Sequence, residues 1–210
     1  MSSMIKDRSL YLVVSEEYGF GKPSVEIAKL AIVGGVDILQ MREKNKTREE
    51  LTALASELSA LCKKNDIPFI VNDDPELAAE CDAAGVHLGQ EDVLKYSISR
   101  TRNILGKNKI IGVSTHSIAE LLKANEEDVD YIAYGPIFHT KTKNYFIGTK
   151  DIKEAARSAK KPLVFIGGIT LLNLDEVLTE GAGSIAVIRD IIQAEDIMER
   201  TRAFKERMGR

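Results

Sequence analysis

The sequence predicts a (β/α)8 barrel, a closed ring of eight parallel strands with helices around the outside. Short apolar runs that suit buried strands recur along the 210 residues, and amphipathic helical patterns lie between them. Eight strand–helix units leave about 26 residues for each unit, which fits a short barrel of this class. An open doubly wound sheet would also explain the alternation, but such sheets usually have fewer strands. The barrel is therefore the favoured fold.

The eight strand candidates are apolar runs, taken here in chain order. They are Leu10 to Val14, Asp37 to Met41, Pro68 to Val71, Gly85 to Leu88, Lys109 to Val113, Tyr131 to Tyr134, Pro162 to Ile166 and Ser184 to Ile188. One helix is expected after each strand. No linker rich in Pro, Gly or Ser divides the chain, so residues 1–210 are expected to form one domain.

Two helices have clear signals at their ends. Glu49 to Lys64 carries apolar residues at spacings of three and four, which mark one buried face. Thr47 followed by Glu50 predicts a capping box that opens this helix. Glu195 to Met208 predicts the last helix, which would close the ring.

The composition favours a cytoplasmic protein that acts on small molecules. Hydrophobic residues make up 44% of the chain and charged residues 29%, which fits a globular domain with a substantial core. No apolar stretch reaches the roughly 18 residues that span a bilayer, and Met1 to Arg8 lacks the apolar centre of a signal peptide. A formal net charge of −3 argues against a nucleic-acid partner. Cys62 and Cys81 are expected to be buried or half-buried thiols.

Polar residues cluster just after the second, third and fourth predicted strands. The six residues are Gln40, Arg42, Lys44, Asn72, Asp73 and Asp92. In a barrel, the carboxyl ends of the strands form one face, and active sites are built there. Arg42 and Lys44 could belong to an ordinary solvated loop, but Gln40 lies within an apolar strand and is harder to explain in that way. These side chains are therefore expected to meet at one rim.

Asp73 and Asp92 follow neighbouring strands and are the candidate metal ligands. Adjacent strands lie about 4.8 Å apart, so the two carboxylates can reach one cation. Ligands that are all oxygen atoms fit magnesium better than zinc. The sequence therefore predicts a Mg²⁺ site, with a diphosphate held nearby by Arg42 and Lys44. Asp74, which follows Asp73, is expected to cap the next helix.

The loops after the last four strands suggest further anion binding. Ser114 and His116 follow the fifth strand, and a Gly-Pro turn after the sixth leads into a basic loop with Thr140, Thr142 and Lys143. This loop is long enough to act as a lid, although a merely flexible basic loop is the alternative.

A second anion site is expected after the seventh and eighth strands, where barrels of this class commonly hold a phosphate. Gly167 and Gly168 follow the seventh strand, and Ile188 and Arg189 end the eighth. Two anion sites predict an enzyme that joins two phosphorylated molecules with loss of diphosphate.

The three histidines are weaker candidates. His87 lies within a strand and is expected to be a hydrogen-bonded structural residue. His116 fits a rim contact and a role at a helix start equally well, and His139 is expected to be peripheral. No arrangement of Ser, His and Asp, or of Cys and His, indicates a nucleophilic mechanism.

Six motifs in this order resemble the thiamine-phosphate synthase family, over nearly the whole chain. They are Gln40-x-Arg42-x-Lys44, Asn72-Asp73, Gly85-Val-His-Leu-Gly-Gln-x-Asp92, Ser114-x-His116, Gly135-Pro-x-Phe-x-Thr140-x-Thr142-Lys143 and Ile166-Gly-Gly-Ile. The resemblance implies a (β/α)8 barrel that couples 4-amino-5-hydroxymethyl-2-methylpyrimidine diphosphate with 4-methyl-5-(2-hydroxyethyl)thiazole phosphate. The products would be thiamine phosphate and diphosphate.

The resemblance also implies a role for each matching residue. Asp73 and Asp92 would bind Mg²⁺. The residues implied at the diphosphate are Arg42, Lys44, Asn72 and Lys143, and those implied at the pyrimidine substrate are Gln40 and Ser114. The residues implied at the thiazole phosphate are Thr140, Thr142, Gly168, Ile188 and Arg189. Lys143, Arg42 and Lys44 would be the catalytic residues, because the main task is to stabilise the departing negative charge.

The chain departs from the family pattern at two positions. Arg189 stands where the family usually has a small residue, often Ser, so its side chain would either strengthen phosphate binding or crowd the pocket. His139 stands where a proline is common.

Three alternative functions remain open. One is a thiazole tautomerase-like paralogue, in which a histidine tends to replace Pro136 and the Thr-x-Thr-Lys segment is degraded. The others are a non-catalytic regulatory barrel that binds phosphorylated metabolites, and another phosphate-handling barrel enzyme such as an epimerase. The expected partners are small phosphorylated substrates, without nucleic acid or membrane, and a homo-oligomer is possible for barrels of this kind.

Overall fold

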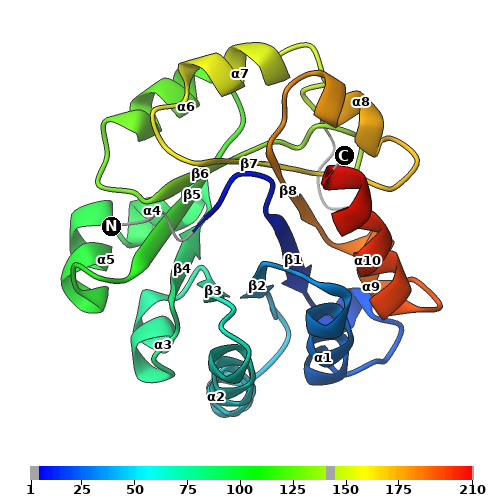
Figure 1. Ribbon diagram of the computed structural model, residues 1–210. Helices are drawn as coiled ribbons and strands as arrows, with labels where there is room; N and C mark the ends of the chain where they lie inside the picture. The colour runs from blue at the N-terminus through cyan, green and yellow to red at the C-terminus, as the bar shows by residue number, and fades with distance from the viewer. Residues whose placement is uncertain (1–4, 141–144, 210) are drawn as a thin grey trace.

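Eight parallel strands close into a barrel, as the sequence predicts. The computed structural model describes residues 5–140 and 145–209. Each strand pairs with the next along the chain, and β8 pairs with β1 to close the ring (Figure 1). The strands are β1 (Leu10–Val14), β2 (Ile38–Met41), β3 (Phe69–Asn72), β4 (Gly85–Leu88), β5 (Ile110–Thr115), β6 (Tyr131–Tyr134), β7 (Leu163–Ile166) and β8 (Ser184–Val187).

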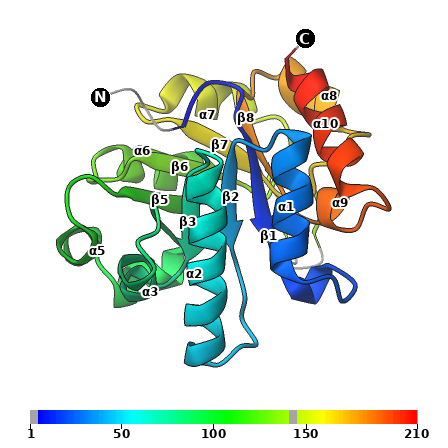
Figure 2. The same ribbon diagram turned by 60° about the horizontal axis from the view of Figure 1, so that its bottom comes forward.

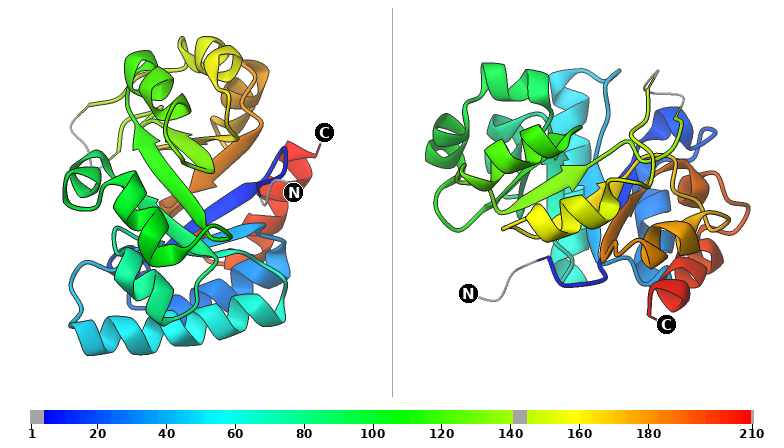
Figure 3. Two further views of the ribbon diagram at one scale, coloured as in Figure 1. Left: turned by 90° about the vertical axis from the view of Figure 1, so that its left-hand side faces the viewer. Right: turned by 90° about the horizontal axis from the view of Figure 1, so that it is seen from above.

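Helices surround the ring on the outside (Figures 1 and 3). They are α1 (Ser24–Gly34), α2 (Arg48–Lys64), α3 (Pro75–Glu80), α4 (Gln90–Lys95), α5 (Ile98–Leu105), α6 (Ile118–Asn125), α7 (Ile152–Ser158), α8 (Leu174–Thr179), α9 (Arg189–Ile192) and α10 (Ile197–Met208), with a 3-10 turn, η1, at Glu16–Tyr18. The prediction of one helix per strand was wrong at two places within the described ranges. Two helices follow β4 and two follow β8, because Ser97 and Asp196 cap new helices there through their side chains.

Helix starts are encoded locally, and the capping predictions are confirmed. The Thr47 hydroxyl accepts a hydrogen bond from the Glu50 amide at 3.3 Å, and the Glu50 carboxylate accepts one from the Thr47 amide at 2.7 Å. Asp74 accepts from the amide of Leu77 at 2.8 Å and opens α3. Such caps satisfy amide groups that have no partner inside the helix.

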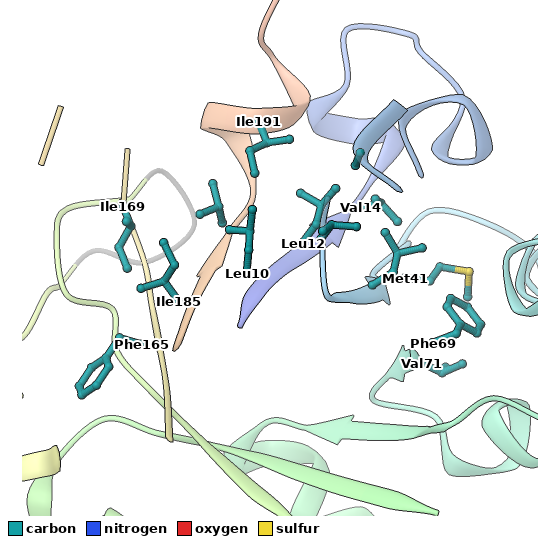
Figure 4. Close-up of a cluster of buried hydrophobic side chains, with 14 of the residues drawn as sticks. Leu10, Leu12, Val14, Met41, Phe69, Val71, Phe165, Ile169, Ile185 and Ile191 are labelled. Atoms are coloured by element: carbon teal, nitrogen blue, oxygen red, sulfur yellow. The ribbon is translucent and has the colours of Figure 1, made fainter. Parts of the chain in front are cut away.

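Side chains alternate between two buried layers along each strand. Those that point outward pack against the helices; Figure 4 shows part of this layer, including Leu10, Leu12 and Val14 of β1 with Met41, Phe69 and Ile185. Those that point inward form a second cluster inside the barrel, to which Tyr11, Ile38, Ile70, Ile110 and Tyr131 belong. Ile5, which precedes β1, also packs into this inner cluster. The period of two in a strand therefore separates the helix-facing core from the barrel interior.

The carboxyl ends of all eight strands lie at the same end of the barrel because the strands are parallel. In Figure 2 the arrows of β1 and β2 point away from the end of the barrel at which β1 begins and α10 finishes. Within the described ranges, no helix has both the length and the apolar character needed to cross a bilayer. Cys62 and Cys81 are free and buried, as expected, and burial raises the pKa of the Cys62 thiol to about 12.

One glycine makes room for a large side chain inside the barrel. A Cβ atom at Gly112 of β5 would lie 2.0 Å from the Tyr131 ring of the neighbouring strand. Tyr131 itself is fully buried and cannot move into solvent. The ring therefore occupies the space that a side chain at position 112 would take.

We expect Gly112→Ala to destabilise the fold by about 1–3 kcal/mol, because overpacking a buried site forces the backbone or the ring to shift. Gly183→Ala is the matched control, since its added Cβ would come no closer than 4.0 Å to other atoms and its φ is not in the left-handed region. Urea unfolding of both variants measures the difference. Equal stabilities would contradict the packing argument.

Candidate active site

A cavity of about 550 Å³ opens at the carboxyl ends of the strands. Nine of the residues predicted at the rim line it: Gln40, Arg42, Lys44, Asn72, Ser114, Thr140, Gly168, Ile188 and Arg189. Two further predicted residues, Thr142 and Lys143, lie outside the described residues. Asp73 and Asp92 interact with each other but are not among the residues that line the cavity; Asp73 directly follows the lining residue Asn72, and the charges of Arg42 and Lys44 act on it.

Arg42 and Lys44 point into the cavity because Glu43, between them, is anchored on the other side of the chain. The Glu43 carboxylate accepts a hydrogen bond from the Glu16 amide at 2.8 Å and another from the Ser24 hydroxyl at 2.6 Å. Burial raises the pKa of Glu43, and these two hydrogen bonds act against the increase. Glu43 thus ties the loop after β2 to the loop after β1 and places two cations on the cavity side.

Asp73 and Asp92 form a pair of neighbouring carboxyl groups. Asp73 has a left-handed backbone with φ of 68°, and its amide donates to the His87 carbonyl at 2.8 Å. Asp92 accepts from the Gly89 amide at 3.1 Å. Burial, followed by the hydrogen bond and charge of Asp92, raises the pKa of Asp73 to about 7, while Lys44 and Arg42 act to lower it. A cation held between the two carboxylates would remove their repulsion.

The donor set at this pair fits a hard divalent cation with several open positions. Across the described part of the chain, no group of three or more His, Cys, Asp or Glu side chains gathers in a way that could hold a metal. Two carboxylates alone leave the remaining positions to substrate oxygens and water, which is the arrangement Mg²⁺ prefers.

A chain of hydrogen bonds crosses the floor of the cavity and joins five strands. Gln40 Nε2 donates to the Tyr11 hydroxyl at 2.8 Å, and the hydroxyls of Tyr11 and Tyr131 are 2.9 Å apart. The His87 ring then lies 2.8 Å from the Tyr131 hydroxyl through Nδ1 and 2.9 Å from the Ser114 hydroxyl through Nε2. Burial lowers the pKa of His87 to about 4, so the ring is neutral near pH 7. The prediction that His87 is a hydrogen-bonded structural residue is confirmed.

Tyr11, Tyr131 and Glu43 belong to the site although the sequence analysis did not select them. Both tyrosines occupy inward positions of their strands, where Tyr11 is paired with Ile38 and Tyr131 with Gly112. A phenol at an inward position of an otherwise apolar strand is a signal that could have identified them, because a buried hydroxyl needs a hydrogen-bond partner.

The opposite wall of the cavity is built from backbone. Gly167 and Gly168 have φ of 103° and 66°, and a Cβ at Gly167 would lie 2.4 Å from Pro136. A Cβ at Gly168 would lie 2.7 Å from the carbonyl oxygen of His139. Only glycine fits both positions, so the chain after β7 packs tightly against the loop after β6.

Arg189 stands on this wall and is held by an aromatic ring. Its guanidinium carbon lies 4.3 Å from the centroid of the Tyr18 ring, within the range of a cation–π contact. Tyr18 and Arg189 both line the cavity. The contact keeps the cationic head of Arg189 at the cavity wall.

The other two histidines also lie at the cavity. His116 fills both roles considered for it: it lines the cavity, and its backbone amide donates to Glu120 at 2.7 Å, at the start of α6. His139 lines the cavity too, so its expected peripheral position was wrong. The loop after β6 turns back over the glycines that follow β7, which brings His139 inward.

Comparison with known proteins decides the family. Residues 10–191 match the model of the family described as thiamine monophosphate synthase. The chain belongs to the thiamine monophosphate synthase family. The resemblance carried by the six sequence motifs is therefore confirmed.

Similarity to members of this family covers nearly the whole chain. A thiamine-phosphate synthase from Halalkalibacterium halodurans is 42% identical, over 92% of each chain. The one from Persephonella marina is 39% identical, over 96% of each. The solved structure of thiamine phosphate pyrophosphorylase from Pyrococcus furiosus superposes with a TM-score of 0.87 at 34% identity, covering 96% of each chain.

We expect Glu43→Ala to cost about 1–3 kcal/mol of stability, because the Glu16 amide and the Ser24 hydroxyl each lose a partly buried acceptor. Glu43→Gln should retain most of that stability, since the amide oxygen can accept the same two hydrogen bonds. Chemical unfolding of both variants provides the measurement. If the two substitutions cost the same, the anchoring role of the carboxylate oxygens is wrong.

Proposed function

We propose that this member of the thiamine monophosphate synthase family is a thiamine-phosphate synthase, a transferase of thiamine biosynthesis. It joins 4-amino-5-hydroxymethyl-2-methylpyrimidine diphosphate to 4-methyl-5-(2-hydroxyethyl)thiazole phosphate and releases diphosphate. One observation carries the proposal beyond family membership. A single cavity has Arg42 and Lys44 on one wall, Gly168 and Arg189 on another, and a neutral polar floor between them. Two anionic substrates with uncharged rings match this distribution.

The chemistry needs no nucleophilic side chain. The bond between the pyrimidinylmethyl carbon and the diphosphate oxygen breaks, and its electron pair leaves with the diphosphate. The resulting cation is stabilised by the amino group of its own ring. The thiazole nitrogen then donates its lone pair to that carbon and forms the new C–N bond. The enzyme's work is therefore to stabilise charge and to orient two rings.

Arg42 and Lys44 are suited to stabilise the departing diphosphate, with the Asn72 amide as a further donor. Asp73 and Asp92 would hold a Mg²⁺ ion, which would supply charge neutralisation at the diphosphate. Lys143, in the Thr-x-Thr-Lys motif, is proposed as a further cation at the same group on the basis of that motif alone.

The thiazole phosphate would bind on the opposite wall. The backbone after β7, with Gly168, allows close approach of an anion, and Arg189 adds a positive charge. Thr140 lines the same cavity, and Thr142 of the motif is proposed beside it. Pro136 also lines the cavity, and the tautomerase-like branch tends to have a histidine at that position. The carboxylate pair favours a synthase over a non-catalytic phosphate-binding barrel, which has no need of a metal site.

The direct test is to incubate the protein with both substrates and Mg²⁺ and to follow the products by chromatography. Thiamine phosphate and diphosphate should appear in equal amounts. No product at saturating substrates would overturn the proposal, and conversion between thiazole tautomers in its place would assign the chain to the tautomerase-like branch.

Asp92→Asn should lower kcat by about a hundredfold at ordinary Mg²⁺ concentration, because the site loses one of its two carboxylates. Asp66→Asn is the control: Asp66 is exposed in the loop between α2 and β3, at the opposite end of β3 from Asn72 and Asp73. Steady-state kinetics over a Mg²⁺ titration separate the two variants. Full activity of Asp92→Asn in excess chelator would exclude the metal role.

Arg189→Ser should raise KM for the thiazole phosphate about tenfold and leave kcat within about twofold, because a charge-assisted hydrogen bond to phosphate is lost. Arg157→Ser, on the exposed face of α7, serves as the control for losing one arginine. A lower KM in Arg189→Ser would mean that the arginine crowds the pocket, which contradicts a binding role.

A further inference from the structure

The hydrogen-bond chain on the cavity floor runs from donor to acceptor in one direction. This direction determines which groups Gln40 and Ser114 present to the cavity. We propose that Tyr11, Tyr131 and His87 are positioning residues that fix Gln40 as an acceptor and Ser114 as a donor toward the cavity. The floor therefore selects a 4-aminopyrimidine over its 4-oxo analogue. The identity of the ring rests on the proposed function. The hydrogen-bond chain from Gln40 to Ser114, called the relay below, rests on the geometry of the free protein.

Once Gln40 is placed, one assignment gives every hydrogen of the relay an acceptor. Gln40 Nε2 donates to the Tyr11 hydroxyl, so Tyr11 uses its own hydrogen to donate to Tyr131. Tyr131 in turn donates to Nδ1 of His87, so Nδ1 carries no hydrogen. The hydrogen of His87 is then on Nε2 and points to the Ser114 oxygen.

The two ends of the relay are consequently coupled. The side-chain nitrogen of Gln40 donates to Tyr11, so its carbonyl oxygen is left to accept a hydrogen bond from a ligand. Ser114 accepts from His87 and keeps its hydroxyl hydrogen to donate to a ligand. Reversing the relay would require Gln40 to flip and every hydrogen in the chain to move, and both ends would then change character together.

The surroundings hold the relay in place. Tyr131 is fully buried, and Tyr11 is only 2% exposed. The absence of a side chain at Gly112 leaves the space in which the Tyr131 ring lies, and the His87 and Tyr131 rings stack with centroids 5.5 Å apart. Buried hydroxyls in such a setting have few other partners. An incomplete network would therefore leave a buried polar group without a hydrogen bond, which lowers stability.

The floor matches one of two closely related rings. A 4-aminopyrimidine offers amino N–H groups as donors and ring nitrogens as acceptors, which suits a carbonyl at Gln40 and a hydroxyl hydrogen at Ser114. In the 4-oxo analogue an oxygen replaces the amino group and a neighbouring ring nitrogen carries hydrogen. The Gln40 carbonyl would then face the ring oxygen, which is also an acceptor, and such a mismatch reduces affinity by about tenfold to a hundredfold.

The relay can be tested first without any substrate. The chain contains three histidines, so the ring nitrogens of His87 can be assigned from spectra of 15N-histidine-labelled wild type, His116→Gln and His139→Gln. Long-range 1H–15N correlation at pH 7 should show His87 with its hydrogen on Nε2 and a bare Nδ1. A ring with its hydrogen on Nδ1 would overturn the proposed direction. This result does not depend on whether the protein is a synthase.

The second test measures recognition by binding alone. Calorimetry gives Kd for the 4-amino and the 4-oxo pyrimidine diphosphates, with Mg²⁺ and without the thiazole. The wild type should prefer the amino compound by at least about tenfold, and Tyr131→Phe should reduce that preference to less than about threefold, because Gln40 and Ser114 are then uncoupled. Tyr11→Phe should act in the same way and replaces Tyr131→Phe if the latter does not fold.

Tyr134→Phe is the matched control, since it lies on the same strand and its buried hydroxyl has no hydrogen-bond partner in the described part of the chain. Its preference should equal that of the wild type. An unchanged preference in folded Tyr131→Phe or Tyr11→Phe would overturn the recognition role. Selective binding of the amino compound without turnover would support the relay while the proposed synthase function fails.

Discussion

The site depends on one constraint, which is that eight parallel strands close into a ring with every second side chain pointing inward. Along these strands the inward residues change from apolar to polar in the direction of the chain. On β2, Ile38 is followed by Gln40, and on β3, Ile70 is followed by Asn72. On β5, Ile110 is followed by Gly112 and then by Ser114. The first residues of each pair fill the barrel and the second form the floor of the cavity. Parallel pairing therefore places these polar residues toward the carboxyl ends of their strands, and all three line the cavity.

Charge at the rim is arranged around that floor. Cationic side chains on the β2 loop are held toward the cavity by Glu43, while two carboxyl groups stand beside them after β3 and β4. A diphosphate and a divalent cation would complete this set of charges. The wall after β7 and β8 instead uses glycine backbone and one arginine, which suits a monophosphate. The asymmetry between the two walls would give each substrate of the proposed reaction its own place in the cavity.

The neutral part of the site is as specific as the charged part. A floor of tyrosine, histidine, glutamine and serine can form hydrogen bonds with polar groups on a ring, and it would add no net charge beneath the cation of the proposed reaction. Burial keeps His87 neutral, and its two ring nitrogens serve different partners. In the proposed reaction such a floor would orient the pyrimidine ring without placing a further charge beneath it.

The sequence by itself determined the ring of strands, the capped helix starts and the family, because these depend on local periodicity and on motifs read in order. Observed strand ends lie within two residues of the predicted ones; β3 and β5 run on through Asn72 and Thr115, since backbone pairing tolerates polar side chains. Only the tertiary structure decided which of the inward residues touch. Tyr11 and Tyr131 are 120 residues apart, and their hydroxyls meet because the barrel closes and Gly112 leaves room. Long-range contacts of this kind have no local signal, since they depend on the register of every strand between them.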